Sequence, residues 1–227
     1  MRSSMRARGL STITALSQCI LERSAQRGGP LRLVSKTTQK DVERKAAAGA
    51  RRAAVLVPIC VVDGELSCVF CVRSAAVSTH KSQVSFPGGH REDGESAADA
   101  ALRETAEEFG ERFREGFEVV DRCLPIPAIT GTVVDAIVAT REAPVDLLAD
   151  VSRSEDEVDT VFSLPLSHLL EHREVRDYGN RGQLPVFAGG PEEIWGLTAY
   201  ILDGVLERLV KPCWKQPTRS PRDTAMF

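Results

Sequence analysis

Residues 88–110 decide the fold, and they read GGHREDGESAADAALRETAEEFG. Across Ser96–Phe109 the sequence is rich in Ala and Glu and contains neither Gly nor Pro. Such a stretch predicts a helix, and Gly110 predicts its end. Gly88 and Gly89 allow the backbone just before the helix to approach a ligand closely.

Three glutamates of this predicted helix share one face, because Glu104, Glu107 and Glu108 are separated by three and four residues. Like charges this close raise one another's pKa. Lysine partners are missing at these spacings, and only Arg103 is near. A bound hard cation would relieve the repulsion, and carboxylate oxygens suit Mg²⁺ or Mn²⁺. For the three glutamates taken alone, a solvated acidic face is the competing interpretation.

The spacing of the whole segment goes beyond this triplet. It reads G-x5-E-x7-R-E-x-x-E-E-x-G from Gly89 to Gly110, which is similar to the Nudix box, the signature of the Nudix hydrolases. Thr105 and Glu111 depart from the family pattern, because apolar residues are usual at these two positions. The resemblance implies an α/β protein with the Nudix fold, in which a mixed β-sheet is sandwiched between helices in a single domain.

The resemblance also implies a chemistry. The expected reaction is hydrolysis of a nucleoside diphosphate linked to another group, with Mg²⁺ or Mn²⁺ as the cofactor. Metal ions neutralise the charge of a diphosphate and lower the pKa of the attacking water. Glu104 and Glu108 would be the principal metal ligands, and Glu107 would be a further ligand or lie just behind the ligands. The resemblance implies that Arg103 orients the glutamates by ion pairing. Three residues would support the structure of the site: Gly89, Glu95 and Arg103.

The segment before the box narrows the substrate class. The pair Arg73-Ser74 and the run HKSQVSFPGG at residues 80–89 resemble the R-S pair and the H-x-G-Q-V-x-F-P-G-G motif of the coenzyme A diphosphatase group, with Ser82 at a glycine position. The resemblance extends over roughly residues 52–212 and is greatest to the mitochondrial animal-type member. For Arg73 and His80 an ordinary surface position is the alternative, although a substrate with several phosphates needs cationic and donor groups here. The resemblance implies substrate contacts by four residues: Arg73, Ser74, His80 and Gln83.

The predicted substrate is therefore coenzyme A or its acyl thioesters, cleaved to 3′,5′-ADP and (acyl-)4′-phosphopantetheine. A glutamate would assist proton removal from water, and the candidates for this catalytic role are Glu104, Glu107 and the loop residue Glu157. For Glu157 a solvated acidic loop is an equal alternative. ADP-ribose is a rival substrate, weakly favoured by Pro125 and Pro127 after the box. A catalytically silent nucleotide-binding module is a further rival, but such modules usually lose box glutamates and all of them are present here.

Strands and further helices are predicted around this segment. Apolar, β-branched runs predict strands at Ala53–Val62 and Leu66–Val72, joined by a hairpin turn at Asp63-Gly64. A short helix is expected after Pro165, and Glu193–Val210 predicts a final amphipathic helix. Three aromatic residues are expected in the core: Phe86, Phe162 and Trp195. For Trp195 a base-stacking platform is the alternative. Three further strands are expected: Phe117–Leu124, Thr132–Thr140 and Val158–Leu164.

The basic N-terminal part of the chain has a different character from the rest. The 227 residues carry a net charge of −3, yet eight basic residues and one acid lie within the first forty. Residues 1–30 are rich in Arg and Ser and resemble a mitochondrial transit peptide, with a disordered or loosely packed extension as the alternative. The mitochondrial matrix is the expected location, and the cytoplasm is the alternative. Four apolar residues of this segment fall at helical spacing: Leu10, Ile13, Leu16 and Ile20.

Composition excludes several other classes of protein. No stretch approaches the roughly 20 apolar residues of a membrane-spanning helix, and the net charge gives no argument for nucleic-acid binding. The family resemblance implies a small nucleotide substrate, coenzyme A or acyl-CoA, as the partner. The expected boundaries are residues 50–212 for the Nudix domain and residues 213–227 for a polar tail.

The six cysteines are scattered along the chain. Cys68 and Cys71 form its C-x-x-C pair, but they lie in a predicted strand, where residues three apart point to opposite faces. Buried free thiols are therefore a better interpretation of this pair than a zinc or redox site. A chain of this length can also bury a core without disulfides.

Overall fold

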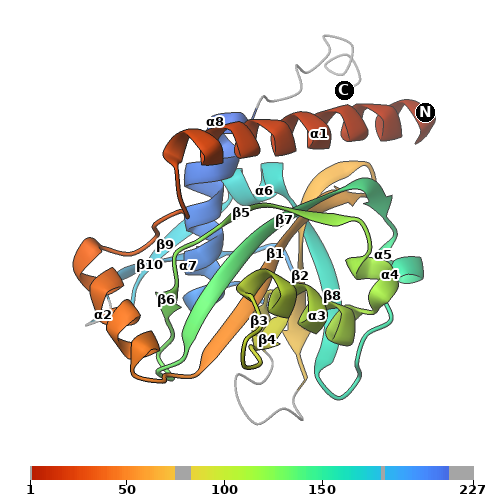
Figure 1. Ribbon diagram of the computed structural model, residues 1–227. Coiled ribbons are helices and arrows are strands. Elements are labelled where there is room, and N and C mark those ends of the chain that lie inside the picture. The colour runs from red at the N-terminus through yellow and green to blue at the C-terminus, as the bar shows by residue number, and fades with distance from the viewer. Residues whose placement is uncertain (1, 75–82, 180–181, 215–227) are drawn as a thin grey trace.

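The computed structural model describes residues 2–74, 83–179 and 182–214, with side chains from Thr12 onward (Figure 1). The helices are α1 (Arg2–Arg27), α2 (Lys36–Ala47), α3 (Ala97–Phe109), α4 (Glu111–Arg114), α5 (Leu147–Asp150), α6 (Leu166–Glu171), α7 (Gly196–Val205) and α8 (Lys211–Cys213). A π-helical turn, η2 (Leu206–Val210), joins α7 to α8. The strands are β1 (Arg52–Val62), β2 (Glu65–Arg73), β3 (Val84–Ser85), β4 (Gly88–His90), β5 (Phe117–Arg122), β6 (Ile126–Pro127), β7 (Val133–Val145), β8 (Val158–Pro165), β9 (Arg173–Asp177) and β10 (Gln183–Phe187).

The central sheet is mixed, as predicted. Its main path has the order β3-β2-β1-β7-β5, with β4 on β1, β6 on β7 and β8 on β2. Strands β1 and β7 run parallel, whereas β2 and β5 are antiparallel to their neighbours in this path. The hairpin between β1 and β2 turns at Asp63 and Gly64, which both have positive φ, at 51° and 85°. These angles suit the two-residue hairpin turn that the Asp-Gly pair predicts.

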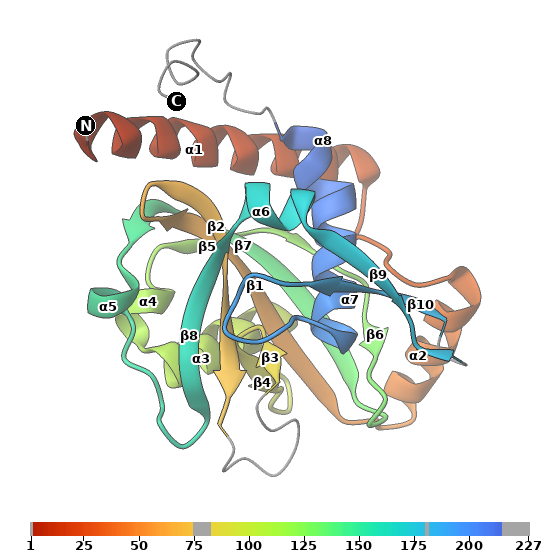
Figure 2. The same cartoon turned by 180° about the vertical axis from the view of Figure 1, so that it is seen from behind.

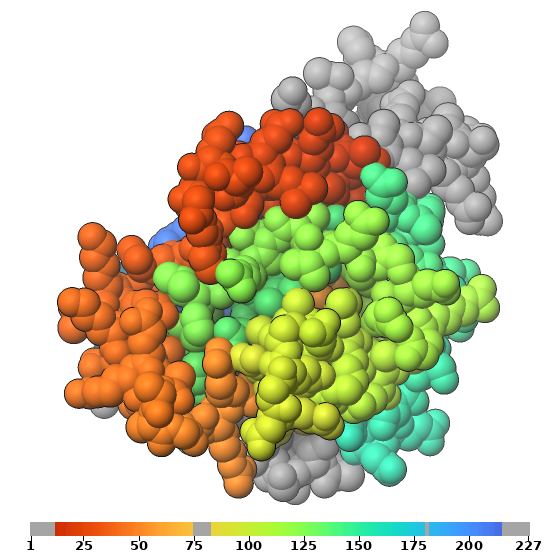
Figure 3. All heavy atoms as spheres, in the orientation of Figure 1, coloured from red at the N-terminus to blue at the C-terminus, as the bar shows by residue number. Residues whose placement is uncertain are grey.

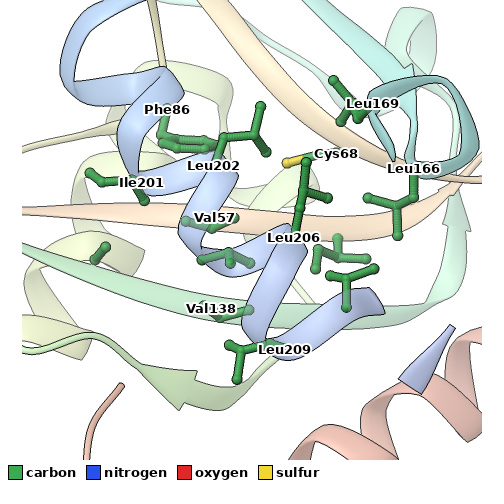
Figure 4. Close-up of a cluster of buried hydrophobic side chains, with 14 of the residues drawn as sticks. Val57, Cys68, Phe86, Val138, Leu166, Leu169, Ile201, Leu202, Leu206 and Leu209 are labelled. Atoms are coloured by element: carbon green, nitrogen blue, oxygen red, sulfur yellow. The ribbon is translucent and has the colours of Figure 1, made fainter. Parts of the chain in front are cut away.

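Two apolar layers hold helices against the two faces of this sheet (Figure 2). On one face, Leu56 of β1 packs in the same cluster as Ala101 and Phe109 of α3. On the other face, Val57 packs with Leu202 and other residues of α7 and η2 (Figure 4). Adjacent residues of β1 therefore serve opposite layers, which explains why this strand is a continuous apolar run rather than an alternating one.

The C-x-x-C pair follows the same alternation. Cys68 belongs to the layer beneath α7, and Cys71 belongs to the layer beneath α3. Both are buried free thiols, which confirms the prediction made from strand geometry. A disulfide is nevertheless present, because Cys19 of α1 is bonded to Cys213 of α8. The expectation that the fold needs no disulfide missed this bond.

The N-terminal helix α1 runs along one edge of the molecule (Figure 3). Ile13, Leu16 and Ile20 are at most 2% exposed and belong to the core layer that contains α7. The predicted apolar stripe is therefore used for packing within the domain. From Thr12 onward the segment is a packed helix and not the loosely packed extension considered from sequence. Its removal as a transit peptide stays a prediction.

Two features of the C-terminal region differ from the sequence-based expectation. The final helix begins at Gly196 and not at Glu193. Trp195 is 41% exposed, so the expectation that it lies in the core is wrong. By contrast, Phe86 is buried, and Phe162 packs partly buried against the same core layer. Among the described residues, no helix is long and apolar enough to cross a membrane.

Candidate active site

The glutamate-bearing helix α3 is fixed at both ends by its own sequence. The Ser96 hydroxyl accepts a hydrogen bond from the backbone N–H of Asp99 at 3.1 Å, which caps the first turn. Gly110 ends the helix with φ of 91°, a conformation that favours glycine. Thr105, at a position usually apolar in the family, is buried. Its hydroxyl donates to the carbonyl of Ala101, which satisfies this polar group inside the protein. Glu111, the other departure from the pattern, is exposed and begins α4.

Glu108 points into the protein from α3 and is 1% exposed. Its Oε2 accepts a hydrogen bond from the backbone N–H of Gly88 at 3.0 Å, and its Oε1 lies 3.6 Å from Nη1 of Arg73. Burial raises the pKa of Glu108 to about 7, although the Gly88 N–H and the Arg73 guanidinium act in the opposite direction. The carboxylate is therefore held at the junction of three segments.

Glu104 lies one turn earlier, half-buried, against the glycine turn. A Cβ atom on Gly89 would collide with the Glu104 carboxylate, so any larger residue here would require that carboxylate to move. Burial is the main cause that raises the pKa of Glu104, and the nearby charges of Glu107 and Glu157 add to it. A divalent cation beside Glu104 would favour the ionised form.

Arg103 connects the box carboxylates to the turn before the helix. Its guanidinium donates to both oxygens of Glu95, at 2.9 and 3.1 Å, and to the carbonyl of His90 at 3.0 Å. The same group donates to Glu104 at 3.0 Å and to Glu107 at 3.2 Å. Arg103 lowers the pKa of Glu95, which also accepts from a backbone N–H in the turn. These contacts tie α3 to the turn before it.

The residues predicted to bind substrate fall into two groups. Arg73 ends β2 and reaches Glu108, and the backbone N–H of Arg73 donates to the carbonyl of Gln83 at 3.0 Å. The backbone N–H of Ser74 donates to the carbonyl of Glu157 at 2.8 Å. The structure therefore brings Arg73, Ser74 and Gln83 to the glutamate end of α3. His80 and Ser82 lie outside the described residues.

Glu157 is exposed and precedes β8, the strand that pairs with β2. Its charge raises the pKa of both Glu104 and Glu108, so it lies within electrostatic reach of the box. The backbone hydrogen bond between Ser74 and Glu157 brings this loop close to the end of β2, from which Arg73 reaches Glu108.

Sequence reasoning missed one contact that orders the site. The Thr198 hydroxyl of α7 donates to the carbonyl of Val84 at 3.0 Å, which fixes the short strand β3 just ahead of the glycine turn. The exposed Trp195 lies at the same end of α7. Nothing in the sequence spacing signals a contact between residues 114 positions apart.

The donor set fits a hard divalent cation. Glu104 and Glu108 are carboxylates with raised pKa values, and Glu107 and Glu157 act electrostatically on Glu104. Oxygen ligands of this kind suit Mg²⁺ and Mn²⁺. In the part of the chain that the structure describes, no three His, Cys, Asp or Glu side chains stand close enough to enclose an ion as they are oriented. Arginines occupy part of that space, since Arg103 holds Glu104 and Arg73 faces Glu108.

Comparison with known proteins identifies the class of protein. The family model described as NUDIX domain matches residues 50–183. The chain therefore belongs to the Nudix family and is a Nudix hydrolase, an enzyme of the class that cleaves pyrophosphate bonds. This confirms the family and the fold inferred from the box.

Individual relatives carry more specific names. The chain is 35% identical over 203 residues to mitochondrial coenzyme A diphosphatase NUDT8 of Mus musculus, covering 82% of this chain and 88% of the mouse protein. It is 37% identical over 181 residues to the Homo sapiens protein of the same name, covering 73% and 72% of the two chains. Among solved structures, a Nudix hydrolase from M. smegmatis, RenU, matches 74% of this chain and 88% of its own at 14% identity and a TM-score of 0.47.

Proposed function

We propose that this enzyme is a Mg²⁺- or Mn²⁺-dependent diphosphatase that hydrolyses coenzyme A or its acyl thioesters. The products would be 3′,5′-ADP and (acyl-)4′-phosphopantetheine. One observation carries this proposal. The segment that resembles the coenzyme A diphosphatase group, Arg73 to Gly89, is in direct contact with the glutamates of the box, through Arg73 and Gly88 on Glu108. The names of the mouse and human relatives support the same substrate class.

Glu104 and Glu108 would hold the metal, with Glu107 as a further ligand or just behind the ligands. When bound, the cation would neutralise diphosphate charge and lower the pKa of the attacking water. Gly89 would keep Glu104 close to the turn, because no side chain separates them. Arg103 and Glu95 would hold the turn and the helix in register.

Arg73 would bind the diphosphate of the substrate. Its guanidinium lies 3.6 Å from Glu108, a distance longer than a hydrogen bond, so it can turn from the carboxylate to a phosphate oxygen. Ser74 and Gln83 would line the same position, and His80 is proposed there from its place in the motif alone. Water would lose its proton to a glutamate, with Glu104, Glu107 and Glu157 as the candidates.

Trp195 would contribute to recognition of the adenine or pantetheine part of the substrate. It is a large aromatic side chain that is 41% exposed and lies at the start of α7. Thr198, in the same turn of this helix, holds β3. Aromatic faces exposed beside a phosphate site suit base stacking.

Kinetics on four substrates test the proposal: coenzyme A, ADP-ribose, NADH and a dinucleoside polyphosphate. We expect the highest kcat/KM on coenzyme A or an acyl thioester. A chelator should abolish the activity. Preference for ADP-ribose would overturn the substrate assignment. Absence of metal-dependent hydrolysis of any of them would favour the silent nucleotide-binding module.

Single variants test the metal ligands. Glu104→Gln and Glu108→Gln should each reduce kcat by about 100-fold or more while the protein stays folded, because each carboxylate would hold the cation that carries the reaction. Glu118→Gln on β5 is a matched control, since Glu118 is exposed and β5 lies at the opposite end of the main sheet path from β2 and β3. Undiminished turnover by either box variant would contradict the assignment.

For location we propose the mitochondrial matrix, with the cytoplasm as the alternative. The relatives are named mitochondrial, and residues 1–30 have the composition of a transit peptide. Sequencing the N-terminus of the protein recovered from mitochondria tests this, and recovery only from the cytosol with Met1 or Arg2 at the N-terminus would refute it.

A further inference from the structure

The two ends of the described chain are joined covalently. Cys19 of α1 and Cys213 of α8 form a disulfide with Cα atoms 5.7 Å apart and a sequence separation of 194. The helical run from α7 through η2 to α8 is thus bonded to the N-terminal helix α1 at its C-terminal end. This bond takes no part in the chemistry of the box.

The other four cysteines differ from this pair. Cys60, Cys68, Cys71 and Cys123 are buried free thiols. Burial raises the pKa of Cys60, Cys71 and Cys123 to about 12, and burial also raises the pKa of Cys68. Because the thiolate is the reactive form, these four are poor partners in thiol exchange.

Cys19 and Cys213 are instead reachable from solvent. Both are only partly buried, and a cavity of about 260 Å³ lies beside their bond. Its lining includes Pro212 and Trp214 as well as both cysteines. A cavity of this size can admit a small thiol to the sulfur atoms.

The bond secures a helix that has a limited set of other anchors. Within the described part of α1, the apolar anchors are Ile13, Leu16 and Ile20. The hydroxyl of Ser17 donates to Thr140 of β7 at 2.9 Å. Arg27 holds both carboxylate oxygens of Asp121 at 2.7 Å, and Asp121 is 5% exposed. These contacts seat the helix, and the disulfide prevents its departure.

We propose that Cys19–Cys213 is a thiol–disulfide exchange site, and that a dithiol reductant converts α1 from a covalently locked layer of the domain to a releasable one. The S–S bond breaks and accepts two electrons and two protons from the dithiol, giving two Cys thiols and the oxidised, disulfide form of the reductant. Reoxidation by a small disulfide reverses the step. The proposal is independent of the substrate.

The locked helix also bears on processing at the N-terminus. Residues from Thr12 to Arg27 contribute buried side chains, an ion pair to a buried carboxylate and one half of the disulfide. Removal of residues 1–30 as a transit peptide would take away Cys19 and these contacts, so the proposed exchange site belongs to the chain that keeps α1 from Thr12.

Thiol counting and thermal unfolding test the proposal on the full chain. After oxidation with glutathione disulfide, denaturation and alkylation without reductant should label four thiols, and alkylation after reduction should label six. Brief treatment of the native protein with dithiothreitol should lower Tm by about 10 °C, because a loop of this length no longer restricts the unfolded chain. Amide exchange in residues 12–27 should become at least about tenfold faster, while kcat/KM at 25 °C stays unchanged.

The control is the double variant Cys19→Ser, Cys213→Ser. Its Tm should match that of the reduced protein and should not respond to dithiothreitol. Six labelled thiols in the oxidised protein, an unchanged Tm on reduction, or an equal Tm response in the double variant would each overturn the proposal. Because the wild-type comparison uses one protein in two redox states, the test does not depend on the folding of the variant.

Discussion

Glu108→Gln should make the metal-free protein more stable at pH 8 than the wild type while removing its activity. In the folded protein the pKa of Glu108 is raised from 4.5 to about 7, with burial as the main cause. Folding therefore favours the protonated form of Glu108. The stability that this protonation contributes is fully present below the pKa of the unfolded state, 4.5, and is lost as the pH rises through the pKa of the folded state, about 7. A shift of this size corresponds to about 3 kcal/mol at pH 8.

The glutamine variant has no proton to lose at this position. Its side-chain carbonyl can still accept the hydrogen bond from the N–H of Gly88, which the carboxylate accepts at 3.0 Å. The variant should thus lose the pH-dependent penalty and keep its local geometry. The advantage of the variant over the wild type should grow by about 3 kcal/mol between pH 4.5 and pH 8, or about 10 °C in Tm.

Urea unfolding in a chelating buffer at pH 4.5 and pH 8 measures this difference. The control is Glu118→Gln, because that glutamate is exposed on β5. Addition of Mg²⁺ at pH 8 should stabilise the wild type and leave the Glu108 variant unaffected, since only the wild type keeps the full ligand set. If the free-energy difference between variant and wild type is the same at both pH values, the burial argument for Glu108 is refuted.

Three further substitutions test separate parts of the structure. Gly89→Ala should reduce kcat by about 100-fold with little change in Tm, because the new Cβ would displace the carboxylate of Glu104. Steady-state kinetics and a thermal scan measure both quantities, and normal turnover would contradict the prediction. Trp195→Ala should raise KM about tenfold through lost stacking and leave kcat nearly unchanged, whereas the control Trp214→Ala at the other end of the helical run should not alter KM; equal KM values would remove Trp195 from the site. Arg27→Ala should destabilise the protein by about 3 kcal/mol, because it leaves the carboxylate of Asp121 buried without its cation. Urea unfolding measures this loss, and Asp121→Asn in the same background should recover part of it; no loss would show that the pair is not a stabilising anchor.

The sequence predicts an element well when the pattern of apolar and turn residues in that element is enough to show how it is buried and where it ends. The continuous apolar run of β1 faces a helix layer on both sides, and the Asp63-Gly64 turn adopts the positive φ values that its residues favour. Helix α3 covers the predicted stretch from Ala97, after the N-cap Ser96, to Phe109, and it ends at Gly110 as predicted. In these cases the local signal and the tertiary environment agree.

Other elements follow from contacts that no local pattern contains. Trp195 looks like a core residue in the periodic pattern of the final helix, but that helix begins one residue later and leaves the indole 41% exposed. The outlying helix α2 and the strand β9 are largely polar, so hydrophobic periodicity gives little signal for them. Cys19 and Cys213 pair across 194 residues, and only the fold brings them together.

The active-site glutamates show how far helical spacing leads. Spacing predicts that Glu104, Glu107 and Glu108 share one face of the helix. In the structure Arg103 donates to both Glu104 and Glu107, whereas Glu108 is buried. Spacing treats them as equivalent, however, whereas burial separates them: Glu108 lies in the protein, Glu104 lies under the glycine turn, and Glu107 is exposed. Burial raises the pKa of the first two, so they gain most from a bound cation and are most costly to ionise without one. The two glutamates that the box resemblance implies as principal ligands are thus the two that this fold buries, and their need for a counter-charge connects the stability of the metal-free protein to its proposed activity.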